Sequence, residues 1–351
     1  MLPSHRHRVE HRARPTGWIV ILPLLLALAG GVANSQCSSK PLPPSAPTIR
    51  LNIVFSDELF SVANRNDVVG ALKLWTEILS CLTTLNLNSK VEIISSQSEI
   101  RRRVHENSVD IVVLDNADFL ELSDAGLIDG AAVGSRDGLP FAVPYLLLVN
   151  QQIDSLNQLR GQRGIYHLHT GAAASLAFAT ALLAESHLGS TGTFFASFES
   201  TTKPANCILP LFFAKIQACV IDGHDWDLLK ELNPQLGRTL KILAQSEPIL
   251  DGIVAFTKVP MPYRERILAS LLQMHKDPLG NQIISALRSG PLIPYRPEFL
   301  DSTRAFWKRY ERILTPVELR TWRETLRTPT TLPFRSSVGA PVGTSTGAVK
   351  E

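Results

Sequence analysis

The sequence lacks the short signatures that mark most catalytic sites. It contains no HExxH zinc motif, no GxxxxGK[ST] phosphate loop and no nucleophile elbow at a strand-to-helix turn. Cysteine is scarce, with four among 351 residues, and neither a CxxC pair nor a Cys/His cluster occurs. We therefore expect no enzyme, no cofactor and no metal site.

Net charge is also small once the N-terminal segment is set aside. The chain has 35 basic and 32 acidic residues, of which residues 1–35 contribute four arginines and one glutamate, leaving 31 of each. A chain with this balance offers no electrostatic footprint for a nucleic acid. We therefore expect no nucleic-acid partner.

Residues 1–35 have the three parts of a secretory signal peptide. Four arginines precede an apolar run over residues 18–32, and residues 33–35 supply a small-residue cleavage site. The apolar run is short for a membrane span and contains Pro23, so we expect removal of the segment and a periplasmic location. Two alternatives stay open, an uncleaved membrane anchor and a lipid anchor on Cys37.

Export to the periplasm would place the cysteines in an oxidising compartment. In an oxidising compartment we expect Cys207 and Cys219 to form a disulfide, because one falls in a predicted helix and the other in the strand that follows. Two buried free thiols are the alternative. Residues 36–48, rich in proline and serine, predict a flexible linker, and residues 327–351, rich in proline, serine, threonine and glycine, predict a disordered tail.

Between these ends, strands alternate with amphipathic helices, a pattern typical of parallel sheets covered by helices on both faces. Residues 141–150 predict a strand that leaves one lobe and enters another, and residues 252–257 predict a strand that crosses back. We therefore expect an α/β fold of two doubly wound lobes joined by a two-stranded hinge. The first lobe would comprise residues 49–145 and 250–326, and the second residues 146–249.

One stretch of the second lobe, residues 159–189, predicts a strand, a loop of small residues and a long apolar helix. The free backbone N–H groups and the positive dipole end at such a helix start can bind an anion. A tight strand-to-helix turn without a ligand is the alternative. The candidate anion site consists of Thr170, Gly171, Ala172, Ala173, Ala174 and Ser175, with His167 and His169 beside it.

Other candidates lie at or just after predicted strand ends, because ligands of α/β sheets bind outside the carboxyl ends of the strands. They are Ser56, Phe60, Asp115, Phe119 and Tyr145 near the first lobe, and Ser200, Thr201 and Asp222 in the second. Each has an alternative role. The two phenylalanines could be core residues, Tyr145 could pack at the hinge, and the hydroxyl and carboxyl groups could cap helices.

Several local patterns resemble the phosphonate-type periplasmic binding proteins of ABC transporters, which have the type II periplasmic-binding-protein fold. They are VDIVVLDNADFLEL at 109–122, the stretch 159–189, STTKPANCILPLFFAKIQACVID at 200–222 and HKDPLGNQIISAL at 275–287. The resemblance covers residues 49–287. It implies an aromatic wall at Phe119 and a cleft-facing carboxylate at Asp222.

The resemblance departs from the family at the anion loop. Family members usually carry serines that hydrogen-bond the phosphonate oxygens, and the matching positions here are Ala172 and Ala174. Because a hydrogen bond to a charged oxygen contributes about 1.5–3 kcal/mol, their loss opens the site to other ligands. A carboxylate, a sulfur oxyanion or a more apolar metabolite then competes with a phosphonate.

Together these features predict a monomeric, non-catalytic solute-binding protein. It would capture a small anionic ligand, such as a phosphonate or phosphate, between its lobes and deliver it to the permease of an ABC importer. The alternative is a periplasmic sensor that reports ligand occupancy to a membrane kinase or cyclase.

Overall fold

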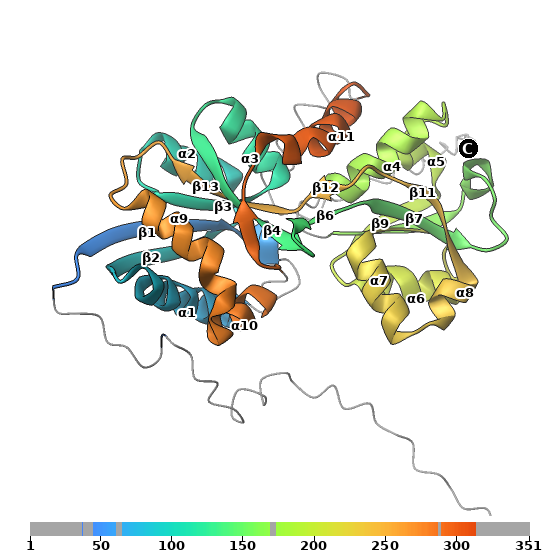
Figure 1. The fold of residues 1–351 in the computed structure, drawn as a ribbon. Coiled ribbons are helices and arrows are strands. Elements are labelled where there is room, and N and C mark those ends of the chain that lie inside the picture. Colours follow the sequence, from blue (N-terminus) through green and yellow to red (C-terminus); the bar gives the residue numbers. More distant parts are fainter. Residues whose placement is uncertain (1–36, 38–44, 61–64, 169–172, 287–288, 314–351) are drawn as a thin grey trace, which may run out of the picture.

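The computed structural model describes residues 37, 45–60, 65–168, 173–286 and 289–313. The predicted signal peptide, most of the linker and the predicted disordered tail lie outside these residues. The described chain forms two bodies, each built on one large sheet, with a narrow two-stranded sheet between them (Figure 1). We call these bodies the first and second lobe, and the narrow sheet the connector.

The first lobe contains a seven-stranded sheet in the order β14-β4-β13-β3-β1-β2, with β5 paired to β4. β1 runs parallel to β2 and β3, whereas β13 is antiparallel to β3 and β4. The sheet is therefore mixed, and the expectation of a parallel sheet was wrong, because β13 returns from the second lobe in the opposite direction. The strands are β1 (Thr48–Ser56), β2 (Asn86–Ile94), β3 (Ile111–Asp115), β4 (Ile128–Arg136), β5 (Leu139–Pro140), β13 (Gly252–Thr257) and β14 (Leu292–Pro294).

The second lobe contains a five-stranded sheet in the order β11-β7-β10-β8-β9. β8 runs parallel to β9 and β10, and β7 is antiparallel to β10 and β11. This sheet is mixed as well, because β7 enters the lobe from the connector against the direction of β10. The strands are β7 (Tyr145–Asn150), β8 (Arg163–His167), β9 (Ser197–Thr201), β10 (Ala218–Asp222) and β11 (Leu240–Gln245).

The connector pairs β6 (Ala142–Val143) with β12 (Ile249–Leu250) in antiparallel register. These two strands are where the chain crosses between the lobes, since β6 leads into β7 of the second lobe and β12 leads into β13 of the first. Pro144 separates β6 from β7, so the single strand expected over residues 141–150 is in fact two. Because proline has no N–H to donate, it interrupts pairing at this point. The strand over residues 252–257 does cross back, as predicted.

Helices cover both sheets because each presents an apolar stripe. In α1, Val68, Leu72, Trp75 and Leu79 recur at helical spacing and are all buried. Pro210 lies inside α6, which ends two residues later at Phe212. The principal helices are α1 (Arg65–Thr83), α2 (Gln97–His105), α3 (Asn116–Asp124), α4 (Ala173–Glu185), α5 (Thr191–Phe194), α6 (Pro204–Phe212), α7 (Gly223–Leu232), α8 (Gln235–Thr239), α9 (Arg264–Gln273), α10 (Pro278–Ala286) and α11 (Asp301–Glu311). Among the described residues, no helix has the length and apolar character needed to cross a membrane.

Helix α11 lies across the connector and contacts both lobes (Figure 1). On the first-lobe side Arg304 donates two hydrogen bonds, of 2.8 and 2.7 Å, to the carboxylate of Asp124 in α3. On the second-lobe side Arg309 pairs with Glu185 at the end of α4. The connector itself is held by the hydroxyl of Thr303, which accepts a 3.0 Å hydrogen bond from the Leu250 amide. α11 therefore braces the two lobes at the point where they join.

Two disulfides are formed, one in each lobe. Cys207 and Cys219 pair as predicted, joining α6 to β10. Cys37 pairs with Cys81 of α1, a bond that the sequence analysis missed because it had placed Cys37 in a free linker. A sulfur held in a disulfide cannot carry a lipid, so the lipid-anchor alternative is wrong for this structure.

Candidate functional site

The carboxyl ends of strands from both sheets meet at the connector. In the first lobe Asp115, the last residue of β3, lies opposite Gly252, two residues after β12. In the second lobe Asp222, the last residue of β10, lies opposite Tyr145, two residues after β6. Because the connector is only two residues long on each strand, these ends are held near each other. The two lobes therefore turn their ligand-binding edges toward one place.

Asp115 caps α3 from this edge. One oxygen, Oδ1, accepts hydrogen bonds from the amides of Ala117 at 2.8 Å and Asp118 at 3.2 Å, while the side chain is 1% exposed. Burial raises the pKa of the Asp115 carboxyl, the amide hydrogen bonds oppose this, and the charge of Asp251 raises it further. The capping alternative therefore holds for Asp115, at a position that still adjoins the connector.

Tyr145 is buried at the start of β7, close enough to carboxylates of both lobes to be affected by their charge. Its backbone amide donates a 2.8 Å hydrogen bond to Ser246 Oγ, and its carbonyl accepts one from the Ser246 amide, so its place at the connector is fixed. Burial raises the pKa of its phenol well above the usual value, and the negative charges of Asp222, Asp251 and Asp115 add to the effect. One ring thus lies within electrostatic reach of carboxylates from both lobes.

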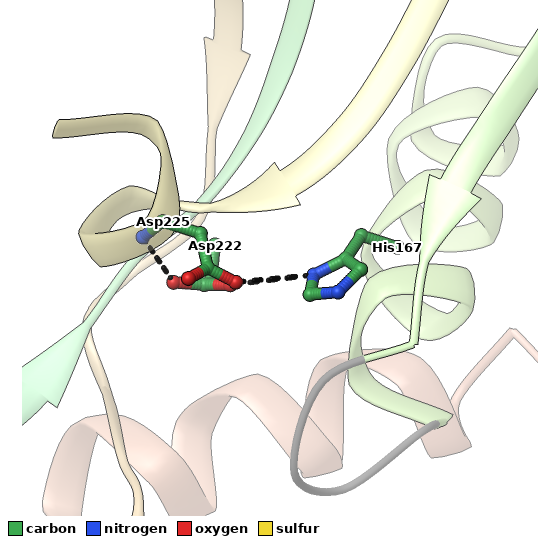
Figure 2. A group of neighbouring side chains, drawn as sticks. All are labelled: His167, Asp222 and Asp225. Carbon is green, nitrogen blue, oxygen red and sulfur yellow. Dashed lines mark hydrogen bonds and ion pairs between the residues drawn. The ribbon is translucent and has the colours of Figure 1, made fainter. Parts of the chain in front are cut away.

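Asp222 belongs to a buried cluster with His167 and Asp225 (Figure 2). Asp222 caps α7, with Oδ1 accepting a 2.9 Å hydrogen bond from the Asp225 amide. The imidazole of His167, at the end of β8, points at both carboxylates, with Nδ1 lying 3.6 Å from Asp222 Oδ2 and 3.4 Å from Asp225 Oδ2. One ligand atom from each residue lies within 4.8 Å of the other two. The sequence had predicted no metal ligands, yet these three side chains have the donor types and spacing to hold a cation.

The predicted anion loop lies mostly outside the described residues, which include neither Thr170, Gly171 and Ala172 nor His169. Ala173 begins α4, and the next two residues, Ala174 and Ser175, are each 1% exposed. Within the described part of the chain, the hydroxyl of Ser175 has no hydrogen-bond partner. The start of α4 is thus buried within the second lobe and carries one hydroxyl whose hydrogen-bonding capacity the described residues leave unused.

Phe60 lines a small apolar pocket of about 100 Å³ at the carboxyl edge of the first sheet. Other aromatic walls are Phe55, Trp75 and Phe141, and Asp251 and Gly252 stand where the pocket meets the connector. Ser56, the last residue of β1, lies next to Phe55 and is 2% exposed.

The remaining candidates have the alternative roles named in the sequence analysis, as core residues or helix caps. Phe119 is fully buried in the core, 5.4 Å from the ring of Tyr295, so its expected role as a cleft wall was wrong. Helical spacing places an apolar side chain on the inner face of α3 whether that face meets a ligand or a core. Thr201 Oγ1 accepts a 3.3 Å hydrogen bond from the Lys203 amide ahead of α6, a local capping contact, and Ser200 is exposed at the end of β9.

Sequence reasoning missed a cation where the lobes meet, Arg136 at the end of β4. Its guanidinium donates a 3.0 Å hydrogen bond to Nδ1 of His224 in α7 and lies 4.6 Å above the ring of Phe141. Together with residues of α7 it lines an open depression of about 470 Å³. Asp225 and Asp251 were also missed as candidates. Only the strand order, which brings β4, β8 and β10 to the connector, identifies these residues.

Two mixed α/β lobes that meet at a two-stranded connector, with their ligand-binding edges turned toward it, define the type II class of periplasmic binding protein. Residues 60–298 match the family model described as ABC transporter, phosphonate, periplasmic substrate-binding protein, and the chain belongs to this family. The predicted resemblance is thereby confirmed. Members bind a substrate and do not convert it, so the expectation of a non-catalytic protein is confirmed too. Family membership implies a small ligand and a membrane permease as partners.

Solved structures of similar fold include XAC2383 from Xanthomonas citri bound to chloride, with 15% identity, a TM-score of 0.56, and 75% of this chain and 98% of that one covered. A binding protein component of an ABC phosphonate transporter from Pseudomonas aeruginosa has 14% identity and a TM-score of 0.54, covering 80% and 95%. PhnD1 from Prochlorococcus marinus in complex with methylphosphonate has 11% identity and a TM-score of 0.54, covering 75% and 98%. At this identity they show the fold alone. No curated protein matches the chain significantly.

Proposed function

We propose that this protein captures a small anionic ligand between its lobes and delivers it to the permease of an ABC importer. The observation that carries the proposal is the meeting of both ligand-binding edges at the connector, where Asp115 and Asp222 end their strands. A two-stranded link of this kind acts as a hinge, so that the lobes close around a bound solute. The protein acts as a monomer in this role.

Arg136 supports an anionic ligand. It stands at the end of a first-lobe strand yet bonds His224 of the second lobe, so its positive charge lies where the lobes meet. A guanidinium there can bind two oxygens of a phosphonate, sulfonate or carboxylate at once. The methylphosphonate in PhnD1 and the chloride in XAC2383 are also anions.

The pocket beside Phe60 supports a ligand with an apolar part. Its volume of about 100 Å³ is smaller than the 150 Å³ or so of an engineered cavity that takes up benzene, so it matches a short alkyl group. An alkylphosphonate or an alkylsulfonate combines both features. The carboxylate of Asp251, which lines this pocket near Tyr145, would favour an amine or hydroxyl on the same ligand.

A thermal-shift screen tests the proposal, with phosphate, phosphite, alkylphosphonates of increasing length, an alkylsulfonate and a carboxylate as probes. A ligand at a hundred times its Kd adds about 2.7 kcal/mol of stability. At about 2–4 °C per kcal/mol for a protein of this size, the transition rises by about 5–11 °C. If none of these oxyanions raises the transition, the proposal is wrong.

Arg136→Gln is the matching variant. Loss of a hydrogen bond to a charged oxygen, at about 1.5–3 kcal/mol, weakens binding of the oxyanion found in the screen by about 10- to 150-fold. Arg163→Gln is the control, because Arg163 is exposed at the opposite end of β8. Equal affinities for both variants would remove Arg136 from the site.

The sensor function remains the second candidate, since the same closure can be read by a membrane kinase or cyclase. Genes for a permease and an ATPase beside this one favour transport. A neighbouring gene for a histidine kinase or a cyclase favours sensing.

A further inference from the structure

Helix α11 is firmly attached to the first lobe. The indole of Trp307 donates a 2.8 Å hydrogen bond to Asn116 in α3, and both side chains are buried. Arg304, nearer the start of the helix, binds both carboxylate oxygens of Asp124 at the end of α3. A buried hydrogen bond is costly to break, because the group left behind has no water to bond. When the lobes move relative to each other, α11 should therefore stay with the first lobe.

The polar contact between α11 and the second lobe lies at the surface instead. Arg309 donates through Nε and Nη2 to the two oxygens of Glu185, the last residue of α4, and through Nη1 to Glu247, just before β12. We call these three residues the Arg309 fork. Their side chains are 35, 39 and 44% exposed. Because an exposed ion pair shifts an equilibrium by only about 1.4- to 5-fold, the fork can open at little cost.

The apolar contact beneath the Arg309 fork allows α4 and α11 to shift slightly. Phe306 and Tyr310 of α11 are buried in the same hydrophobic cluster as Ala177 and Phe178 of α4, and the two helices pack against each other. Apolar attraction is not directional, so helices packed in this way can slide by a small distance. The fork has a fixed geometry, because a guanidinium and a carboxylate pair through two parallel bonds. The fork therefore determines where α4 lies against α11.

A second contact between the lobes lies on the opposite face of the connector. In the second sheet, α4 covers the face that carries Val220, and α6 and α7 cover the face that carries Ile221. Figure 1 shows α11 above the connector and α7 below it. Arg136 of the first lobe bonds His224 in α7 at 3.0 Å, and both residues line the open depression described above. This depression and the Arg309 fork are thus on opposite sides of the connector.

Contacts on opposite sides of a hinge oppose each other. A rotation about the connector that brings α7 toward the first lobe, and so closes the depression around a ligand, draws α4 away from α11. We propose that the Arg309 fork opposes this closure and that Arg309 is a positioning residue for ligand capture, although it lies outside the ligand site. A bound ligand must supply the free energy that opens the fork, so ligand affinity depends on the fork. The effect on affinity rests on the proposed function, whereas the effect on the angle between the lobes does not.

The angle between the lobes can be measured without a ligand. Spin labels are attached to the protein carrying Val69→Cys in α1 and Leu232→Cys in α7, two positions that are 52 and 75% exposed. α1 and α7 lie on the same side of the connector, so closure shortens the distance between the labels (Figure 1). All four native cysteines are held in disulfides, and the introduced cysteines are therefore the only free thiols. Pulsed electron spin resonance gives the distribution of label distances.

Arg309→Gln and Glu185→Gln open the fork from its two sides, and both should shift the label distances toward shorter values. The ratio of closed to open protein should rise about 2- to 30-fold in Arg309→Gln, which loses two ion pairs, and about 1.4- to 5-fold in Glu185→Gln, which loses one. Arg309→Lys keeps the charge but not the paired bonds, so it should restore part of the wild-type distribution. Lys308→Gln, at an exposed neighbour on α11, is the control and should change nothing. Unchanged or longer distances in both fork variants would overturn the inference, even if their thermal transition falls.

Titration with methylphosphonate separates this inference from the proposed function. If the closed form is the one that binds, the Kd for methylphosphonate should fall in Arg309→Gln by up to the same factor as the ratio of closed to open protein rises. Shorter label distances in the fork variants, without binding of methylphosphonate or any other oxyanion of the thermal-shift screen, would retain the role of the fork and refute the anion-carrier function. Binding with equal Kd and equal label distances in the wild type and both fork variants would retain the carrier function and refute the role of the fork.

Discussion

The hydrogen bond between Trp307 and Asn116 should be a main contributor to the brace formed by α11. The indole Nε1 donates a 2.8 Å bond to Asn116 Oδ1, and the Asn116 amide donates a 2.7 Å bond to the carbonyl of Leu250 in the connector. Trp307 is 6% exposed and Asn116 4% exposed. One chain of contacts therefore joins α11 to α3 of the first lobe and to the strand that returns from the second.

Trp307→Phe removes the donor and keeps most of the ring. The Asn116 oxygen then stays buried without its partner, which costs about 1–3 kcal/mol. For a protein of this size the thermal transition should fall by about 2–12 °C. Urea unfolding, followed by circular dichroism, measures the same loss as a lower midpoint with an unchanged slope.

Trp226→Phe is the matched control. Trp226 is 3% exposed, and its ring packs beneath the ammonium of Lys230 at 5.2 Å. Trp226→Phe therefore removes the same indole atoms as Trp307→Phe but breaks no hydrogen bond to a buried side-chain amide. A double-mutant cycle of Trp307→Phe with Asn116→Ala should give a coupling energy of about 0.5–3 kcal/mol. A coupling near zero, together with equal losses at Trp307 and Trp226, would refute the reasoning.

Two further predictions concern stability. Replacing both cysteines of the Cys37–Cys81 pair, 44 residues apart, with alanine should cost about 4 kcal/mol by chain entropy, against about 3 kcal/mol for the Cys207–Cys219 pair at 12 residues, as measured by urea unfolding. The reverse order would contradict this account. Because burial raises the pKa of Asp115, the cost of its charge to stability is absent below the unfolded value near 4, grows as pH rises from there to the folded value, and is constant above it. Asp115→Asn removes the charge but keeps a side-chain oxygen that can cap α3. The urea midpoint of this variant should therefore rise relative to that of the wild type between pH 4 and pH 7. A difference in midpoint that does not change with pH would show that the charge costs nothing.

The sequence predicted the elements better than their pairing. The alternation of strands and helices located two lobes, and the strand at residues 252–257 crosses back as expected. β4 was missed because its sequence, IDGAAVGSR, is rich in glycine, alanine and serine, which have low strand propensity. The direction of β7 and β13 within their sheets depends on the connector, which no local pattern specifies.

Site prediction failed where a role depends on partners far away in the chain. Asp222 was chosen because it ends a strand, but its contact with His167 requires β8 and β10 to be neighbours. Arg136 stands at the end of an unpredicted strand, so nothing marked it. Phe119 has the spacing of any inward-facing helical residue, and only packing distinguishes a core position from a cleft wall.

The insertion of β13 between β3 and β4 determines when each half of the molecule can be completed during synthesis. Every strand of the second sheet falls between residues 145 and 245, so that half can form as soon as this one segment has emerged. The first sheet stays split, with a gap between β3 and β4, until residue 257 has followed. The half that is made first is therefore finished last, and its open strand edges need protection in the meantime.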